Sequence, residues 1–242
     1  MRQTIEIIFE DEELIIVNKP ANVLTIPDRH DADKLSVYRF LSDRSEEKIY
    51  IVHRLDRETS GILCFAKNET AHRNLSMQFE HKDVQKIYYA LIDGVMHDEA
   101  GVIDKAIGEH PTIPGKMSIS KKGKESLTHY AVKERFKNFT LVEADIKTGR
   151  MHQIRIHFQS IGYPLAVDSL YGRRDVFYLS ELKQKKFRLG KLEEERPIIS
   201  RCTLHAFRLS LLHPTTGERI EFEAEPPKDF SAVLSQLRKW GK

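Results

Sequence analysis

The sequence predicts an α+β fold: a single catalytic domain around a mixed, mostly antiparallel β-sheet, with flanking helices and a central active-site cleft. Three observations support this prediction. β-like runs outnumber helical stretches, many runs are joined in pairs by short turns, and the helices lack the regular strand–helix–strand order of a parallel sheet. No strong linker and no fixed-period repeat divides the 242 residues, so residues 1–242 are expected to form one domain.

The first half of the chain alternates β-like runs with two helical stretches. Strands are expected at residues 4–9, 14–20, 50–56, 61–68 and 85–94, and helices at residues 37–44 and 69–82. The first two strands flank an acidic turn and predict a hairpin. In the second helix, Ala71, Leu75 and Phe79 recur every four residues on one face, and Asn68 or Thr70 is suited to cap its start.

The second half predicts two hairpins and two helices. The hairpins are expected at residues 127–149 and 204–227, and the helices at residues 150–162 and 229–240. Lys137 and Asn138 form the turn of the first hairpin. Gly162 is expected to end the first helix and Asp229 to cap the second. Residues 108–125 carry two prolines with several glycines and lysines, and they predict a long basic loop.

The composition predicts a cytoplasmic protein with reduced cysteines. A hydrophobic fraction of 40% is enough for a substantial core, and no window approaches the apolar length that spans a bilayer. The N-terminal stretch MRQTIEIIFEDEEL has too short an apolar run for a signal peptide. Cys64 and Cys202 are far apart and belong to no CxxC pair, so neither a disulfide framework nor a thiolate zinc site is expected.

Positive charge is concentrated in one region of the chain. The net charge is only +3, but residues 115–200 contain 18 Lys and Arg against 10 Asp and Glu, a local net charge of +8. The runs SKKGKE (120–125) and KQKKFRLGK (183–191) belong to this region. Such runs form either a solvated face or a surface that contacts phosphates of a nucleic acid, and the sequence leaves both open.

The stretch IVHRLDRETSGILCFAKN (51–68) places a charged cluster between apolar runs. The cluster consists of His53, Arg54, Asp56 and Arg57. An arginine beside a carboxylate stabilises its ionised form by charge and by hydrogen bonding, which keeps it available as a base or nucleophile. These residues favour a single aspartate acting on a nucleic-acid substrate.

Three other chemistries have weaker support. His152 and His157 are spaced i, i+5 rather than i, i+4, and no HExxH motif is present, so no metal site is predicted. A two-carboxylate hydrolase would pair Asp56 with Asp145 or Asp168, but nothing in the sequence joins them. No GxxxxGK[ST] or GxGxxG motif is present to cradle a nucleotide phosphate.

Several motifs in register resemble the RluA-type pseudouridine synthases. HRLDRETSG (53–61) resembles the family signature, and the other matching segments are DEELIIVNKPANVLTIP (11–27), KIYYALIDG (86–94), TGRMHQIRIHFQSIGYPLAVDSLYG (148–172) and LHAFRLSLLHPTTGE (204–218). Lys19 and Pro20 match the usual Lys-Pro pair. The chain departs from the pattern at Asn22, where Gly is common, and at Val167-Asp168, where Gly-Asp is usual. The resemblance extends from about residue 11 to residue 230.

The resemblance implies an enzyme that isomerises uridine in RNA without a cofactor. It implies Asp56 as the essential catalytic residue, Arg155 as the arginine that pairs with it, and Tyr88 as the active-site tyrosine. Strand alternation sends Tyr89 to the opposite face. The residues expected to bind RNA are His53, Arg54, Lys86, Arg150 and His152. Whether the aspartate attacks the sugar, adds to the base or removes a sugar proton is left open.

The resemblance also implies the partner and leaves a rival reading. RNA is the expected partner, either ribosomal RNA of the 23S type, transfer RNA or both, and we expect a monomer without a required protein partner. The chain resembles the compact members that lack an N-terminal RNA-binding domain of the S4 type. The alternative is a catalytically silent RNA-binding or chaperone module on the same fold. An intact HRLD aspartate favours catalysis.

Overall fold

The computed structural model describes residues 4–28, 31, 34–183, 187–188 and 194–241. These residues form two compact units, each assembled from two chain segments. Unit 1 comprises Met1–Tyr88 and His205–Glu225, and unit 2 comprises Tyr89–Leu204 and Pro226–Lys242. The chain therefore passes between the units three times, and each unit is described below by itself. Both contain more strand than helix, which confirms the predicted α+β class.

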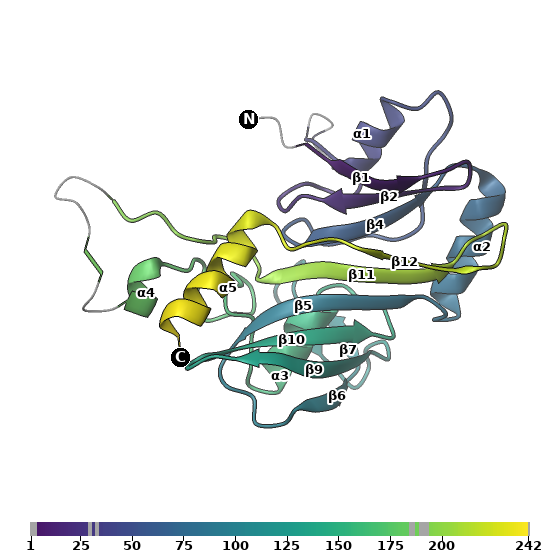
Figure 1. Cartoon of the computed structure of the whole chain (residues 1–242). Coiled ribbons are helices and arrows are strands. Elements are labelled where there is room, and N and C mark those ends of the chain that lie inside the picture. The colour runs from purple at the N-terminus through teal and green to yellow at the C-terminus, as the bar shows by residue number, and fades with distance from the viewer. Residues whose placement is uncertain (1–3, 29–30, 32–33, 184–186, 189–193, 242) are drawn as a thin grey trace. The chain divides into compact units, whose positions relative to one another are not determined.

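Unit 1 is built on a mixed sheet with the strand order β1–β2–β4–β11 (Figure 1). Its strands are β1 (Glu6–Glu10), β2 (Leu14–Lys19), β3 (Tyr50–Ile51), β4 (Ser60–Ala66), β11 (Leu204–Leu212) and β12 (Arg219–Glu223). β3 pairs with β4, and β12 pairs with β11. All of these pairs are antiparallel except β4 with β11, which is parallel. The two predicted hairpins, β1–β2 and β11–β12, are confirmed.

Two helices complete unit 1, namely α1 (Val37–Ser42) and α2 (Glu69–Glu80). The predicted cap of α2 is confirmed, since the Asn68 side chain accepts a hydrogen bond from the N–H of Ala71 at 2.9 Å. Ala71 and Leu75 are fully buried and pack with Cys64 and residues of the strands in one apolar cluster. The helical periodicity therefore identified the face of α2 that meets the sheet.

Gly61 makes the parallel pairing of β4 with β11 possible. It lies opposite Ala206 and has a φ of 115°. A Cβ atom at position 61 would lie 2.1 Å from the carbonyl oxygen of Ala206. Only glycine combines this backbone conformation with so close an approach of a neighbouring strand.

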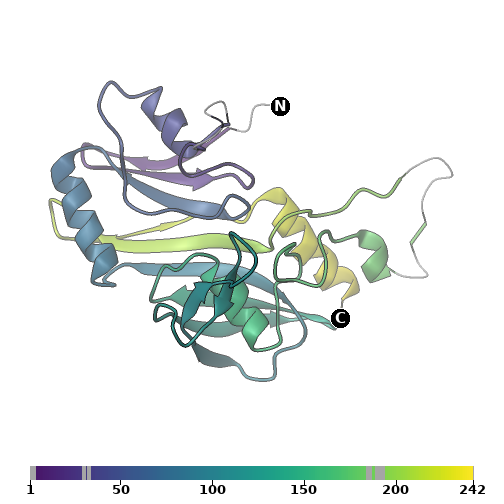
Figure 2. The same cartoon turned by 180° about the vertical axis from the view of Figure 1, so that it is seen from behind.

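Unit 2 contains a second set of strands with the order β5–β10–β9–β6 and a separate hairpin, β7–β8. The bounds are β5 (Gln85–Asp93), which begins in unit 1, β6 (Ala100–Asp104), β7 (Ile107–Glu109), β8 (Met117–Ile119), β9 (Leu127–Arg135) and β10 (Phe139–Ile146). The helix α3 (Gln153–Ser160) crosses one face of β9 and β10 (Figures 1 and 2). The predicted β9–β10 hairpin and the end of β5 before Gly94 are confirmed.

The helices α4 (Leu179–Lys183) and α5 (Lys228–Trp240) also belong to unit 2. The apolar face of α5 packs with residues from β5, β10 and the connecting segments, and its buried members are Phe230, Val233, Leu234 and Leu237. Tyr89 packs against the same cluster. Among the residues that the structure describes, no helix is long and apolar enough to cross a membrane.

Two expected elements differ from the structure near charged segments. The run at residues 50–56 pairs only as Tyr50–Ile51, and the rest forms a loop held by side chains. Part of the expected basic loop at residues 108–125 is the β7–β8 hairpin, because Ile107 and Met117 pack with Ile156 and Tyr171 in a small apolar cluster. The predicted basic run at residues 183–191 lies largely outside the described residues.

The predicted cap of the last helix is wrong. Pro227 is the N-cap residue of α5, and Asp229 lies in the first turn. Both carboxylate oxygens of Asp229 instead accept hydrogen bonds from the Arg201 guanidinium at 2.7 Å. A partner 28 residues away thus takes the carboxylate that local capping rules assign to the helix.

We predict that Gly61→Ala destabilises the protein by at least about 3 kcal/mol, because a positive φ and a backbone clash act together. Gly162→Ala is the matched control, since Gly162 also has a positive φ (88°) but a Cβ atom added there would meet no other atom within 4 Å. The control should lose only about 1 kcal/mol. Urea denaturation measures both values, and equal losses would show that the close approach to Ala206 is relieved easily.

Candidate active site

Residues 52–59 form the loop that carries the Asp56 carboxylate, and a threonine from a distant segment pins it. Leu55, next to Asp56, is buried. Its N–H donates to Oγ1 of Thr25 at 3.1 Å, and the Thr25 hydroxyl donates to its carbonyl oxygen at 2.9 Å. Since one side chain satisfies both backbone groups of Leu55, the backbone that enters Asp56 has a defined position.

A buried lysine fixes the other side of the same loop. Lys19 is completely buried at the end of β2. Its Nζ donates to three carbonyl oxygens, those of Pro20 (3.0 Å), Val23 (2.8 Å) and Arg57 (3.0 Å). An ammonium group has three protons to donate, so these bonds use its full capacity. Lys19 therefore joins the segment after β2 to the residue that follows Asp56.

The chain after Asp56 is anchored through a buried histidine. The N–H of Thr59 donates to the carbonyl oxygen of Asp56 at 3.2 Å, which closes a turn. His205 then lies between the Ser60 hydroxyl (2.9 Å to Nδ1) and the carbonyl oxygen of Ala224 (2.7 Å to Nε2). The carbonyl can only accept, so Nε2 carries a proton, and in the neutral imidazole Nδ1 then accepts from the Ser60 hydroxyl.

His53 has the environment of a structural residue. Its ring stacks on Phe79 with centroids 4.6 Å apart, and its Nε2 accepts a hydrogen bond from the N–H of Cys64 at 3.0 Å. Burial and, to a smaller extent, the charge of Lys86 lower the pKa of His53 to about 3. The ring is therefore neutral at physiological pH, which favours a role in fixing the loop over attraction of RNA phosphates.

Tyr88 lies close enough to Asp56 to be influenced by its charge. Tyr88 is 7% exposed, on β5. Burial, and after it the negative charge of Asp56, raise the pKa of the Tyr88 hydroxyl above its usual value of 10. The hydroxyl is thus kept in its protonated form. The structure places both of these predicted catalytic residues in unit 1.

The remaining cations predicted in unit 1 differ in exposure. Arg54 and Arg57 are exposed, so their guanidinium groups are accessible to a polyanion. Lys86 is only 7% exposed, with its Nζ 5.4 Å from the centroid of the Phe79 ring. Arg54 is therefore the better placed of the predicted residues to meet RNA.

In unit 2, Arg155 forms a buried bidentate ion pair with Asp168. The Nε and Nη2 atoms of Arg155 lie 2.7 Å from the two carboxylate oxygens, and the side chains are 3% and 0% exposed. Oδ1 of Asp168 also accepts from the backbone N–H groups of Leu170 and Tyr171. These bonds compensate for the burial of both charges and fix the plane of the guanidinium. Because Asp56 belongs to unit 1, its pairing with Arg155 stays a prediction.

Gln153 organises the segment that leads into α3. Its amide group makes four hydrogen bonds: Oε1 accepts from the Thr148 hydroxyl (2.7 Å) and the Arg150 N–H (3.0 Å), and Nε2 donates to the Leu127 carbonyl and the Thr128 hydroxyl (both 3.0 Å). His152, just before it, has a φ of 56°, which is uncommon outside glycine. Arg150 and His152 thus lie in a tightly fixed turn.

The alternative chemistries are not supported by the positions of their residues. Both ring nitrogens of the buried His157 are engaged, with the Thr128 hydroxyl and the Lys105 carbonyl oxygen, each at 2.9 Å. Asp168 is held by Arg155, and Asp145 lies 2.6 Å from the Nζ of Lys147. Both carboxylates are thus engaged with cations of unit 2.

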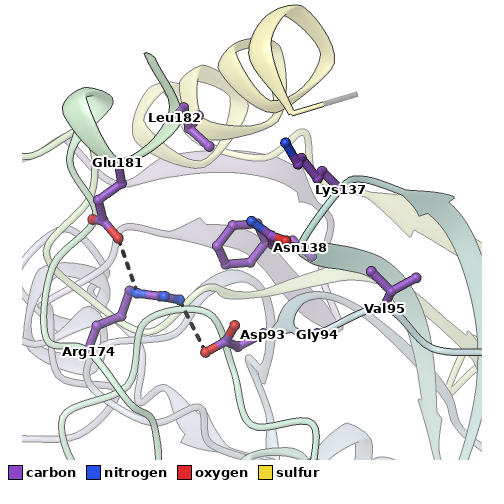
Figure 3. Close-up of a pocket in the computed structure, with 9 residues that line it drawn as sticks. Asp93, Gly94, Val95, Lys137, Asn138, Arg174, Glu181 and Leu182 are labelled. Atoms are coloured by element: carbon purple, nitrogen blue, oxygen red, sulfur yellow. Dashed lines mark ion pairs between the residues drawn. The ribbon is translucent and has the colours of Figure 1, made fainter. Parts of the chain in front are cut away.

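A pocket in unit 2 is lined by Arg174, whose backbone is hydrogen-bonded to that of Asp168. It has a volume of about 460 Å³, and Arg174 crosses it between Asp93 (3.3 Å) and Glu181 (3.4 Å) (Figure 3). The guanidinium also lies 5.2 Å from the centroid of the Phe139 ring. The backbone carbonyl of Arg174 accepts a hydrogen bond from the N–H of Asp168 at 3.1 Å. The charge of the Arg174 guanidinium is thus compensated within the pocket, and its backbone holds that of Asp168.

Residues 13–160 match the family model described as RNA pseudouridylate synthase. The chain belongs to the RNA pseudouridylate synthase family. Asn22, where the family commonly has glycine, has a φ of 63°, a conformation that glycine and asparagine adopt more readily than other residues. This departure therefore preserves the backbone of the segment that Lys19 holds.

Curated relatives extend the match beyond the family model. An uncharacterized RNA pseudouridine synthase of Aquifex aeolicus is 38% identical and covers 97% of this chain, which spans 73% of the relative. The ribosomal large subunit pseudouridine synthase D of Pseudomonas aeruginosa is 37% identical, with coverage of 97% and 72%. The ribosomal large subunit pseudouridine synthase C of Haemophilus influenzae is also 37% identical, with coverage of 97% and 69%. Family membership makes this chain a pseudouridine synthase, an isomerase.

Solved structures show the same fold. Human RNA Pseudouridylate Synthase Domain Containing 4 has a TM-score of 0.74 at 24% identity and covers 96% of this chain and 93% of its own. Human RNA Pseudouridylate Synthase Domain Containing 1 has a TM-score of 0.69 at 28% identity, with coverage of 93% and 84%. The predicted fold class and family are confirmed.

Sequence reasoning missed the residues that anchor the site. No role was predicted for four of these residues, namely Thr25, Gln153, Asp168 as the partner of Arg155, and Tyr171. Lys19 was predicted only as part of a motif. A polar residue inside an apolar or motif segment is the sequence signal that could have identified each of them. The partner of that residue lies far away in the sequence, so only the fold identifies the partner.

We predict that Lys19→Met lowers the free energy of unfolding by about 3 kcal/mol, because three carbonyl oxygens lose a charged donor. Hydrogen exchange at residues 55–59 should accelerate, since the Asp56 loop loses one anchor. Lys137→Met, at an exposed lysine, is the control and should change stability by less than about 0.5 kcal/mol. Unchanged exchange in Lys19→Met would contradict the anchoring role.

We also predict that His53 makes the protein less stable as the pH falls. Its pKa is about 3 in the folded protein and 6.5 ordinarily, so between these values the unfolded state binds a proton that the folded state does not. Stability is therefore lost below about pH 6.5, by about 2 kcal/mol at pH 5.

His53→Gln keeps an acceptor for the Cys64 N–H and removes the titration. Urea denaturation at pH 7 and pH 5 should show a decrease that is about 2 kcal/mol larger in the wild type than in this variant. Parallel pH profiles would mean that His53 has the same pKa in the folded and the unfolded protein.

Proposed function

We propose that this protein converts uridine to pseudouridine in the RNA of the large ribosomal subunit, with Asp56 as the catalytic residue and without a cofactor. The relatives named as ribosomal large subunit pseudouridine synthases support this substrate. Transfer RNA is the second candidate substrate. The proposal includes a cytoplasmic location and a monomer that needs no protein partner.

The observation that carries the proposal is the fixed Asp56 loop beside Tyr88. Lys19 and Thr25 hold the backbone on both sides of Asp56, and the charge of Asp56 acts on the buried Tyr88 hydroxyl. A carboxylate held in advance loses little freedom when the substrate binds, which lowers the barrier to reaction. A turn-capping aspartate would need no such support.

The proposed reaction is an isomerisation that balances within the substrate. The N1–C1′ bond of uridine breaks, the uracil turns, and a new bond forms between C5 and C1′. C5 then loses a proton and N1 gains one, so no oxidant, reductant or other co-reactant is needed. Asp56 takes part as a carboxylate in each of the three possible first steps.

Tyr88 acts in this proposal as a neutral phenol. Its raised pKa disfavours a phenolate, so the hydroxyl is a hydrogen-bonding group rather than a free base. A phenol can assist the loss of the C5 proton only if its own proton passes to another acceptor. Its ring is also suited to stack on the uracil.

The cationic residues are proposed to handle the RNA. A stacked uridine has an inaccessible glycosidic bond, so it must leave the RNA stack. Arg54 is exposed next to the Asp56 loop, and Arg150 is exposed in the turn before α3. We assign them to the RNA backbone and assign Arg155 as the partner of Asp56. His152, Lys86 and His53 are the other residues predicted to contact RNA, and of these His53 is the one whose lowered pKa makes it neutral.

We predict that Asp56→Asn reduces the isomerisation rate by at least about 10³-fold, because the amide cannot act as a nucleophile or base. RNA affinity should stay within about threefold of the wild type, since one uncharged group replaces one of many contacts. Tritium release from RNA labelled at uridine C5, taken from cells that lack the protein, measures the rate.

Asp43→Asn is the matched control, because this aspartate is 72% exposed and lies in unit 1. Ribosomal RNA and transfer RNA are assayed separately. Release from transfer RNA alone would replace the ribosomal substrate in the proposal. Near-normal turnover by Asp56→Asn would remove Asp56 from the centre of the reaction, and binding without release by the wild type would favour the silent module.

A further inference from the structure

Tyr171 lies where the β7–β8 hairpin meets α3. The side chain is 2% exposed and belongs to the apolar cluster with Ile107 and Ile156. Its Oη atom is 2.7 Å from the backbone nitrogen of Met117 in β8 and 2.9 Å from Nδ1 of His152, the residue before α3. One hydroxyl thus connects the hairpin to the turn that precedes the helix of Arg155.

The rest of Tyr171 contacts the buried ion pair. The Cζ atom of Arg155 lies 5.1 Å from the centroid of the ring, and the backbone N–H of Tyr171 donates to Oδ1 of Asp168 at 3.1 Å. The Nζ of Lys116, on the hairpin side, is 5.4 Å from the same centroid. Tyr171 therefore contacts the hairpin and both members of the Arg155–Asp168 pair.

The hydroxyl makes two hydrogen bonds at one oxygen atom. The N–H of Met117 can only donate, so the Oη atom accepts there, and the same hydroxyl also bonds to Nδ1 of His152, as donor or acceptor according to the tautomer of the imidazole. A displacement of β8 therefore moves a hydrogen bond that holds His152. Because His152 has a left-handed backbone conformation, its position depends on such partners.

The segment at residues 107–125, which contains the β7–β8 hairpin and the turn after it, is basic and is fixed where it closes. Residues 107–125 contain four lysines against two glutamates, namely Lys116, Lys121, Lys122 and Lys124 against Glu109 and Glu125. Ile107 and Lys124 exchange both backbone hydrogen bonds, at 2.9 and 2.8 Å. Lys121 and Lys122 are exposed in the turn between β8 and Lys124. A polyanion bound at these lysines can therefore displace β8, which is hydrogen-bonded to Tyr171.

We propose that Tyr171 is a positioning residue that couples RNA bound at the β7–β8 hairpin and the turn after β8 to Arg155. Its hydroxyl links β8 to His152, and its ring and backbone contact Arg155 and Asp168. RNA on the lysines of this segment thereby sets the position of the arginine that the proposed function assigns to catalysis. The inference rests on that function for the role of Arg155.

The first test is Tyr171→Phe, which keeps the ring contacts and removes the hydroxyl. The single-turnover rate at saturating enzyme should fall about tenfold, the equivalent of one buried hydrogen bond, while the RNA Kd changes by less than about threefold. Tyr163→Phe, in the same unit, is the control and should leave both unchanged. A residue with a purely structural role would lower the melting temperature and leave the saturated rate intact.

The second test asks whether the hairpin acts through the hydroxyl. In the wild type, Lys121→Ala with Lys122→Ala should weaken RNA binding and also lower the saturated rate. In the Tyr171→Phe background the same pair should weaken binding by an equal factor without lowering the rate further. Rate effects that multiply in full, or lysine changes that leave the Kd unaltered, would overturn the coupling.

Wild type and Asp56→Asn are measured in the same assay. An active wild type, an inactive Asp56→Asn and a Tyr171→Phe with the normal rate would overturn the coupling alone. A wild type that binds RNA without forming pseudouridine would remove the proposed function and this inference together.

Discussion

The buried ammonium of Lys19 is the interaction on which the Asp56 loop depends. Residues 52–59 have no regular secondary structure, so their backbone groups need partners from elsewhere. Placing a charge in the interior is unfavourable unless it is fully hydrogen-bonded, and the three carbonyl oxygens around Lys19 meet this condition. Thr25 and His205 extend the same principle along the loop. The aspartate can therefore sit on an irregular segment and still be precisely placed.

In unit 2, other residues fix a segment that has no regular secondary structure. Gln153 satisfies the backbone of the turn before α3 with its amide, as Lys19 does with its ammonium in unit 1. The Arg155–Asp168 pair then fixes a guanidinium in the interior, and Arg174 braces the segment that carries Asp168. In both units a buried polar side chain thus holds the backbone of a segment that has no regular secondary structure.

The sequence was sufficient for features that depend on neighbours along the chain. The β1–β2 and β9–β10 hairpins and the Asn68 cap follow from alternation, turns and local hydrogen bonding. It failed where a distant partner decides the outcome: Asp229 binds Arg201 instead of capping α5, and the Asp56 loop is held by residues far from it. The candidate site came from motif resemblance, and its anchors came only from the fold. Burial also lowers the pKa of His53, so this member of the charged cluster is neutral in the folded protein.

The charges around Asp56 have a consequence for how the site depends on pH. His53 is neutral down to about pH 3, and the Tyr88 hydroxyl keeps its proton because burial and Asp56 oppose its ionisation. The positive charge of the loop therefore comes from Arg54 and Arg57 rather than from His53. RNA is then not attracted to this loop by a charge on His53. A change in the reaction rate of the folded protein between about pH 5 and pH 9 must arise from groups other than His53 and Tyr88.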